Sequence, residues 1–268
     1  MLKSFFKALE MNVRVFFQYR ASFALSLISF PVVLIVNAML FERIYAHTGT
    51  DVIRGYSLSQ MIWYYASVPF IYVFIYTFTA MRLSQRILSG ELTMDFLRPL
   101  HIYLFEFAHA AASRVIGVAV EFLPTLFVYS LIYFPDFLTF ASFLKFVATA
   151  VLAFVLMFQL NFIVGLTAFV LKDNRAVDDV KNITLGLLGG AAVPMDFMPE
   201  AVRRVADFLP FQYVFYEPLQ FFLNKPETAG VMPLLHTVSA QIGWIALLFV
   251  VNRVVWAYFA RRFCAAGG

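Results

Sequence analysis

Apolar residues fill long runs of this chain, and polar residues gather in short breaks between the runs. Six runs have roughly the 20 residues that an α-helix needs to cross the hydrocarbon core of a bilayer. They cover residues 21–42, 57–80, 102–133, 141–171, 177–195 and 231–257. The pattern predicts an all-α membrane protein with six spanning helices. The third and fourth runs are long enough to tilt or to extend into water.

Two amphipathic segments accompany these runs. In residues 1–20, polar positions recur every three or four residues opposite a face of Leu, Val and Phe. This spacing predicts a helix in the membrane interface, with a disordered tail as the alternative. Residues 196–228 are too amphipathic to cross the membrane, too apolar for a free loop, and interrupted by prolines. We expect them to form a re-entrant or interfacial helical hairpin.

Composition excludes a soluble fold. Apolar residues make up 62% of the chain and charged residues 13%, against about 25% charged residues in a typical soluble domain. The net charge of +4 does not predict nucleic-acid binding, because Lys and Arg are dispersed among the runs. The single cysteine, Cys264, excludes an intrachain disulfide.

The distribution of positive charge predicts the orientation. Roughly twice as many Lys and Arg residues fall on the side that holds both termini as on the other side, which places the termini in the cytoplasm of a multi-pass cell-membrane protein. Residues 81–101 and 172–182 then face the cytoplasm, and residues 196–228 face outward. Residues 1–268 are expected to form a single transmembrane domain.

A polar segment at residues 81–101 interrupts the apolar first half of the chain. Gly90 and Pro99 punctuate it, and its charged residues are Arg82, Arg86, Glu91, Asp95 and Arg98. A compact charged element between two membrane spans is typical of a surface that docks to a soluble partner. An ordinary solvated loop is the alternative.

The sequence carries no recognisable catalytic motif. No glycine-rich phosphate loop or His-Glu-x-x-His zinc motif is present. Asp173, Asp178 and Asp179 form one acidic group, whereas the magnesium-diphosphate sites of membrane prenyltransferases need two. A solvated cytoplasmic turn explains these aspartates more simply. We therefore expect no catalytic residue, metal or cofactor in this chain.

Arg114 and Glu121 are charged residues within the third apolar run. Seven residues apart on a helix, they face the same way at a separation of about 10 Å. Ionisable groups at such depth are candidates for translocation or for a subunit interface. We favour the simpler interpretation, in which each pairs with a polar group on a neighbouring helix; the candidates are Asn37, Gln159 and Asn161.

Several segments, taken in order, resemble the type-2 ABC transporter permeases, in particular the subgroup of about 260 residues that occurs as paired permeases beside a separate ATPase. The landmarks include Ser89-Gly90-Glu91 and Leu97-Arg98-Pro99. The resembling segments cover nearly the whole chain and are Phe17–Phe23, Gly55–Tyr65, Ile87–Leu100, Pro194–Pro218 and Ala260–Gly268.

The resemblance implies a coupling helix at about Ser84–Arg98 that docks in a groove of the ATPase, aided by the amino-terminal helix. It also implies that Met195–Asn224 caps the pathway from outside, and that two identical or homologous permeases form the conduit. At such a joint, charged residues form pairs at the rim and apolar residues fill the groove. The expected ATPase-coupling residues are Arg86, Ile87, Leu88, Gly90, Glu91, Leu92, Asp95 and Arg98.

The leading functional hypothesis is the permease subunit of an ATP-driven exporter that moves a hydrophobic or amphipathic solute outward. Its partners would be ABC ATPase subunits, a second permease chain and membrane lipid. A membrane scaffold that anchors an ATPase for another machine is the alternative. Apolar contacts discriminate poorly between solutes, so drugs, lipids and peptides fit the sequence alike.

Overall fold

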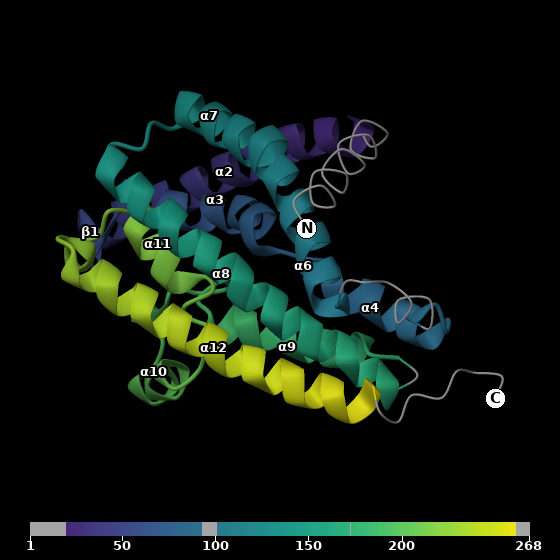
Figure 1. Ribbon diagram of the computed structural model, residues 1–268. Coiled ribbons are helices and arrows are strands. Elements are labelled where there is room, and N and C mark those ends of the chain that lie inside the picture. The colour runs from purple at the N-terminus through teal and green to yellow at the C-terminus, as the bar shows by residue number, and fades with distance from the viewer. Residues whose placement is uncertain (1–19, 93–100, 172, 261–268) are drawn as a thin grey trace.

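The computed structural model describes residues 20–92, 101–171 and 173–260, and these residues are almost wholly helical (Figure 1). The membrane-scale helices are α2 (Arg20–Thr48), α3 (Leu58–Ile75), α6 (Ile102–Gly117) continued by α7 (Leu123–Ile132), α8 (Phe140–Leu166), α9 (Arg175–Leu188) and α12 (Met232–Ala260). The shorter elements are β1 (Val52–Ile53), β2 (Tyr56–Ser57), α4 (Thr79–Leu88), α10 (Glu200–Asp207), α11 (Tyr216–Phe222) and the single turns Thr167–Phe169, Met195–Phe197 and Pro226–Thr228. The helix expected at residues 1–20 lies outside the described residues except for Arg20.

Each predicted span contains a helix of the fold, but the second and fifth predicted spans extend past the ends of α3 and α9 into non-helical residues. Among the described residues, four segments are long and apolar enough to cross a membrane: Ser29–Thr48, Ile102–Ile132, Phe140–Phe169 and Met232–Ala260. The chain is therefore a multi-pass membrane protein. The second and fifth predicted spans correspond to α3, with 18 residues, and α9, with 14. A helix of 14 residues rises only about 21 Å, so six complete crossings stay a prediction.

Local sequence explains where several helices begin. Ser57 and Gln60 exchange side chain–backbone hydrogen bonds and cap the start of α3, and Thr139 and Ser142 do the same for α8. In the third predicted span, Pro124 lacks a backbone N–H, and the turn before it widens into a π-helix at Val118–Phe122. The helix thus continues through the proline instead of ending there.

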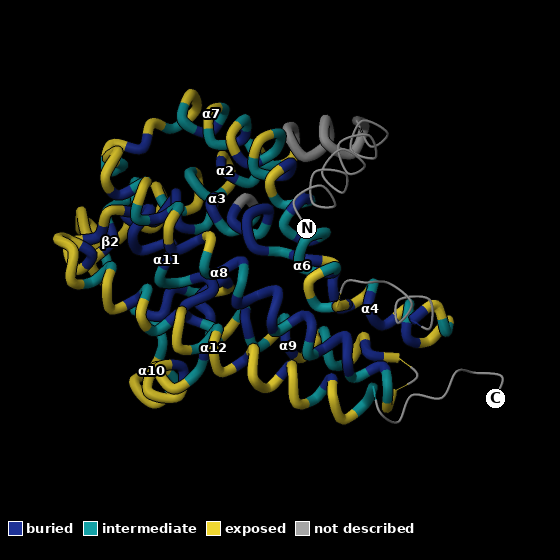
Figure 2. The backbone as a smooth tube through the Cα atoms, in the orientation of Figure 1, coloured by how far each residue is buried: buried dark blue, intermediate teal, exposed yellow. Residues whose placement is uncertain are grey.

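Helix α8 forms the centre of the bundle. It packs against α3, α4, α11 and α12, and α12 runs beside it along its length (Figure 1). Buried residues concentrate on α3, α8 and α11, whereas much of α12 is exposed (Figure 2). The core is rich in aromatic rings, and several meet edge to face; they include Trp63, Phe74, Phe122, Tyr129, Phe146 and Phe222.

Polar side chains fix α12 to α8 at two levels. Asn252 donates to the Gln159 side chain at 2.6 Å, and Gln241 donates to the backbone carbonyls of Thr149 and Tyr213, each at 2.9 Å. Hydrogen bonds between helices set their register where apolar contacts alone would not. The bond to Tyr213 also attaches the chain between α10 and α11 to this pair of helices.

The close approach of α4 to α8 depends on Gly165. A Cβ atom at this position would lie 2.9 Å from the Leu83 side chain, which is closer than packed carbon atoms approach. We expect Gly165→Ala to lower the free energy of unfolding by about 1–3 kcal/mol through overpacking. A lower melting temperature of the detergent-solubilised protein would confirm this.

Gly186→Ala is the matched control, since Gly186 is also helical and has no neighbouring atom within 4 Å of an added Cβ. It should leave the melting temperature unchanged or raise it. Equal melting temperatures for the two variants would contradict the close contact between α4 and α8.

Candidate functional site

Residues 84–92, which include the second half of α4, are the described part of the predicted coupling helix Ser84–Arg98, and α4 lies at one end of the bundle (Figure 1). The opposite end, formed by the β1–β2 turn, α11 and the start of α12, we call the pocket end. The buried face of α4 packs into a second apolar cluster with α8, and consists of Thr79, Ala80, Leu83, Ser84 and Ile87. Its exposed face carries Met81, Gln85 and Leu88.

Gly90 ends this helix. Its φ of +77° is the left-handed conformation that glycine adopts most readily after a helix C-terminus. The Ser89-Gly90-Glu91 landmark is thus a helix stop that turns the chain, with Glu91 exposed and Leu92 buried. Asp95 and Arg98, the other charged residues predicted for this segment, lie outside the described residues.

A buried carboxylate attaches α4 to α6. Glu106, whose side chain is only 1% exposed, accepts a hydrogen bond from Arg86 Nη1 at 2.8 Å, and Arg82 Nη2 lies 3.5 Å from the same Oε1 atom. Arg82 and Arg86 are four residues apart on one helix face and would repel each other without this shared anion. The ion pair between Arg86 and Glu106 therefore attaches α4 to α6 within the same chain.

The segment between α3 and α4, residues 76–78, is not helical, and polar side chains satisfy its backbone. Tyr76 is extended, so the Val73 carbonyl lacks the donor that one more helical turn would supply. Arg114 Nη1 of α6 donates to that carbonyl at 2.8 Å. Asn161 Nδ2 of α8 donates to Thr77 Oγ1 at 2.8 Å and to the Thr77 carbonyl at 3.2 Å.

Helix α9 joins this network through Lys181. Its ammonium group donates to Asn161 Oδ1 and, at 2.7 Å, to Asp178 Oδ1. Asn182 donates to the second oxygen of Asp178 at 3.1 Å. Four helices, α3, α6, α8 and α9, therefore meet around residues 76–78, which precede α4. We call this network the α3–α4 clamp.

The α3–α4 clamp includes Arg114, one of the two charged residues in the third apolar run that are predicted to pair with a neighbouring helix. Arg114 bonds to a neighbouring helix as expected, but its partner is a backbone carbonyl and not Asn37, Gln159 or Asn161. Glu121 lies in the π-helical turn and interacts electrostatically with Arg114. A role for either residue in translocation stays a prediction.

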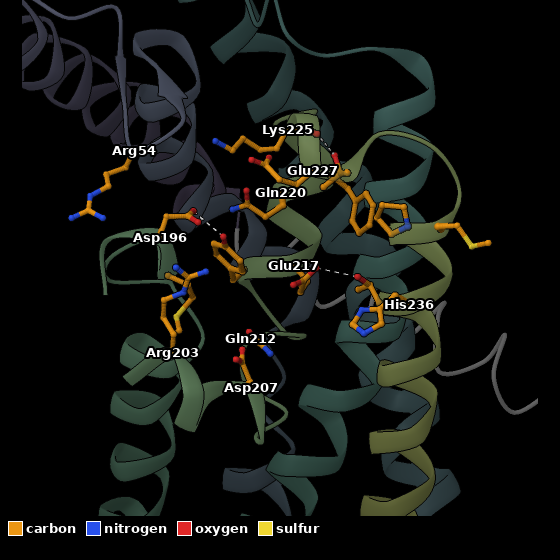
Figure 3. Close-up of a pocket in the computed structure, with 17 residues that line it drawn as sticks. Arg54, Asp196, Arg203, Asp207, Gln212, Glu217, Gln220, Lys225, Glu227 and His236 are labelled. Carbon is orange, nitrogen blue, oxygen red and sulfur yellow. Dashed lines mark hydrogen bonds between the residues drawn. The ribbon is translucent and has the colours of Figure 1, made fainter. Parts of the chain in front are cut away.

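A polar cavity of about 640 Å³ opens at the pocket end (Figure 3). We call it the polar pocket. Beside it, Asp196 accepts hydrogen bonds from Tyr56 at 2.5 Å and Tyr216 at 2.8 Å. Lys225 donates to the Gly55 carbonyl and lies over the Tyr56 ring, 3.6 Å from its centroid, and burial lowers its pKa. These contacts hold the β1–β2 turn against the hairpin before α12.

Sequence reasoning missed Glu106, Lys181 and the polar pocket. Glu106 is a lone carboxylate in an apolar run, and this was the available signal. Lys181 belongs to the segment 172–182 that is predicted to face the cytoplasm, but it is buried against Asn161. The pocket residues come from segments far apart in the chain and carry no common motif. Within the described residues, no three His, Cys, Asp or Glu side chains gather as a metal site would require.

Comparison with protein families decides the class. Residues 31–267 match the profile described as ABC-2 family transporter protein. The chain belongs to the ABC-2 family. It is accordingly the membrane component of an ABC transporter, a class that works with an ABC ATPase. No curated protein and no solved structure matches it.

The ion pairs of this ABC-2 permease allow a direct test of how α4 is held. Glu106→Gln keeps the side-chain shape but removes the carboxylate charge that Arg82 and Arg86 share, so we expect α4 to lose about 2 kcal/mol of local stability. Hydrogen–deuterium exchange should show faster exchange of the α4 amides.

Asp173→Asn is the control, because the pair that Asp173 forms with Arg175 is exposed and 3.8 Å long and contributes little. Unchanged α4 exchange in Glu106→Gln, or equal acceleration in both variants, would contradict the anchoring role of Glu106.

Proposed function

We propose that this chain is the permease subunit of an ATP-driven exporter, and that α4 with the segment after it receives the movement of the ATPase. The family match supports a transporter subunit, and the attachment of α4 to α6 and α8 is the observation that carries the coupling role. Two such permeases, identical or homologous, would form the conduit for a hydrophobic or amphipathic solute.

The faces of α4 divide the predicted coupling residues into two groups. Leu88, with 49% of its surface exposed, Gly90 and Glu91 are accessible to a partner. Ile87 and Leu92 are buried in the chain's own apolar cluster, and Arg86 is paired with Glu106. We therefore assign direct ATPase contact to the first group and assign the second to holding α4 rigid.

A rigid attachment is what mechanical coupling requires. If the ATPase displaces α4, Glu106 passes the force to α6, while Leu83 against Gly165 passes it to α8. The α3–α4 clamp adds α9 through Lys181. Packed helices move as rigid bodies or slide by shear and do not deform continuously. One displacement at α4 would thereby move several spans together.

Charge reversal at Glu91 tests the docking surface. Because Glu91 is exposed and outside the Glu106 ion pairs, Glu91→Arg should leave the fold and membrane insertion intact. The amount of ABC ATPase that co-purifies with the permease should fall roughly tenfold. Groups on the ATPase that attract the Glu91 carboxylate would repel an arginine at the same position, and such repulsion opposes association.

Asp51→Arg at the pocket end is the matched control, because Asp51 is also exposed and acidic. It should retain the ATPase. Full recovery of the ATPase with Glu91→Arg, or equal loss with both variants, would count against docking through this segment.

A further inference from the structure

The polar pocket carries charges that the fold does not use. Arg54 and Arg203 line it, and neither side chain makes a hydrogen bond or an ion pair within the described part of the chain. Arg204, the residue next to Arg203, is paired with Glu200 and does not line the pocket. The two arginines at the pocket thus keep their donor groups available, whereas their neighbour does not.

The pocket separates its charges in space. In Figure 3, Arg54 and Arg203 lie on the left, on either side of Asp196, and Glu217 lies nearer the centre. Glu217 accepts one bond, from Thr237 at 3.0 Å to Oε2, and no bond to its Oε1 is formed within the described residues. Burial raises the pKa of Glu217, and the hydrogen bond from Thr237 and the nearby His236 oppose this shift.

Buried polar groups form the wall between these two sides. Gln220, which is 6% exposed, donates to the Tyr56 hydroxyl at 2.9 Å, and Lys225 is 3% exposed. Asp196 is occupied by two tyrosine hydroxyls. Among the lining groups that remain, the two guanidinium groups lie on one side of the pocket, and the desolvated carboxylate of Glu217 lies away from them.

The surroundings of the pocket are those of a membrane surface. The long apolar helix α12 begins at Met232, and Met232, His236 and Thr237 in its first turns line the pocket. Met232 is 79% exposed, and Phe208, at the end of α10, is 81% exposed. A polar site at the end of a spanning helix, with exposed apolar side chains beside it, lies at the level of lipid head groups.

We propose that the polar pocket binds the zwitterionic head group of an amine-bearing phospholipid. The phosphate would lie between Arg54 and Arg203, because guanidinium groups bind phosphate oxygens in pairs. The ammonium group would face Glu217, and the acyl chains would leave past Met232 and Phe208. A volume of about 640 Å³ is within the range of small-molecule sites.

The mixed lining distinguishes this ligand from a simple anion. Three cationic side chains, Arg54, Arg203 and Lys225, face four carboxylates, those of Asp196, Asp207, Glu217 and Glu227. An anionic lipid without an amine would meet the arginines but leave Glu217 buried without a cation. An unpaired buried charge costs free energy, so the site should prefer the zwitterion.

Native mass spectrometry of the detergent-solubilised permease tests the proposal. With equal amounts of phosphatidylethanolamine and phosphatidylglycerol, the wild-type chain should retain phosphatidylethanolamine preferentially. In the double variant Arg54→Asn and Arg203→Gln, retention should fall roughly tenfold or more, because two charge-assisted bonds are lost. The backbone φ of Arg54 is +50°, a left-handed conformation that asparagine adopts more readily than most residues, so asparagine is the replacement at this position.

Two further variants separate binding from folding. Arg204→Gln, beside Arg203 on α10, should retain the lipid as the wild type does. Glu217→Gln preserves the bond from Thr237 and should abolish the preference for phosphatidylethanolamine over phosphatidylglycerol. Equal retention of the two lipids by the wild type, or wild-type retention by the double variant, would overturn the proposal.

Competition with O-phosphoethanolamine identifies the source of the head group. If O-phosphoethanolamine displaces the lipid at a concentration similar to that of the lipid, the pocket recognises the two charges as proposed, but its ligand is a soluble zwitterion. No displacement would support the bound lipid and its acyl chains as the ligand. The assay contains no ATPase and no nucleotide, so its outcome is independent of the proposed export function.

Discussion

The fold depends on satisfying the backbone where α3 stops and α4 begins. A buried carbonyl without a donor costs free energy, and residues 76–78 lie outside any helix. Arg114 and Asn161 supply the missing donors from α6 and α8. Because a cationic donor next to the end of α3 also complements the negative end of the helix dipole, Arg114 serves both purposes. Without these donors the chain would have no stable way to change direction at this point.

The clamp makes α4 a separate helix whose direction is fixed from several sides. A continuous helix through residue 88 would have placed α4 in line with α3. The break instead allows α4 to lie against α8, with its two arginines on Glu106 and Leu83 against Gly165. Each attachment uses a different type of interaction, an ion pair, a close apolar contact and a set of backbone hydrogen bonds. Their directions differ, so together they restrict α4 more than any one of them could.

The apolar runs were sufficient to locate the long helices, because length and hydropathy decide whether a helix can cross a bilayer. The run predicted at 231–257 is the helix Met232–Ala260, and the predicted polar segment after 81 begins within α4. The roles of individual residues could not be obtained in the same way. Ile87 was expected to face a partner but is buried against α8, since periodicity identifies the apolar face of a helix without identifying what covers it. The polar pocket could not be predicted from the sequence for a related reason. Arg54 and Glu217 are far apart along the chain and line the same pocket only after the chain has folded.

The two ends of the molecule use charge in opposite ways. At the α4 end, Arg82, Arg86 and Lys181 have partners inside the chain, and the bonds to Glu106 and Asn161 join neighbouring helices. At the pocket end, Arg54 and Arg203 have none within the described residues, although keeping two guanidinium groups beside apolar surface has no benefit for stability. Charges that do not serve the fold are expected where a ligand will pair with them. Helix α12 connects the two ends, because its first turns line the pocket and its Asn252 is bonded to α8 nearer the α4 end. Occupation of the pocket and displacement of α4 would therefore act on the same pair of helices.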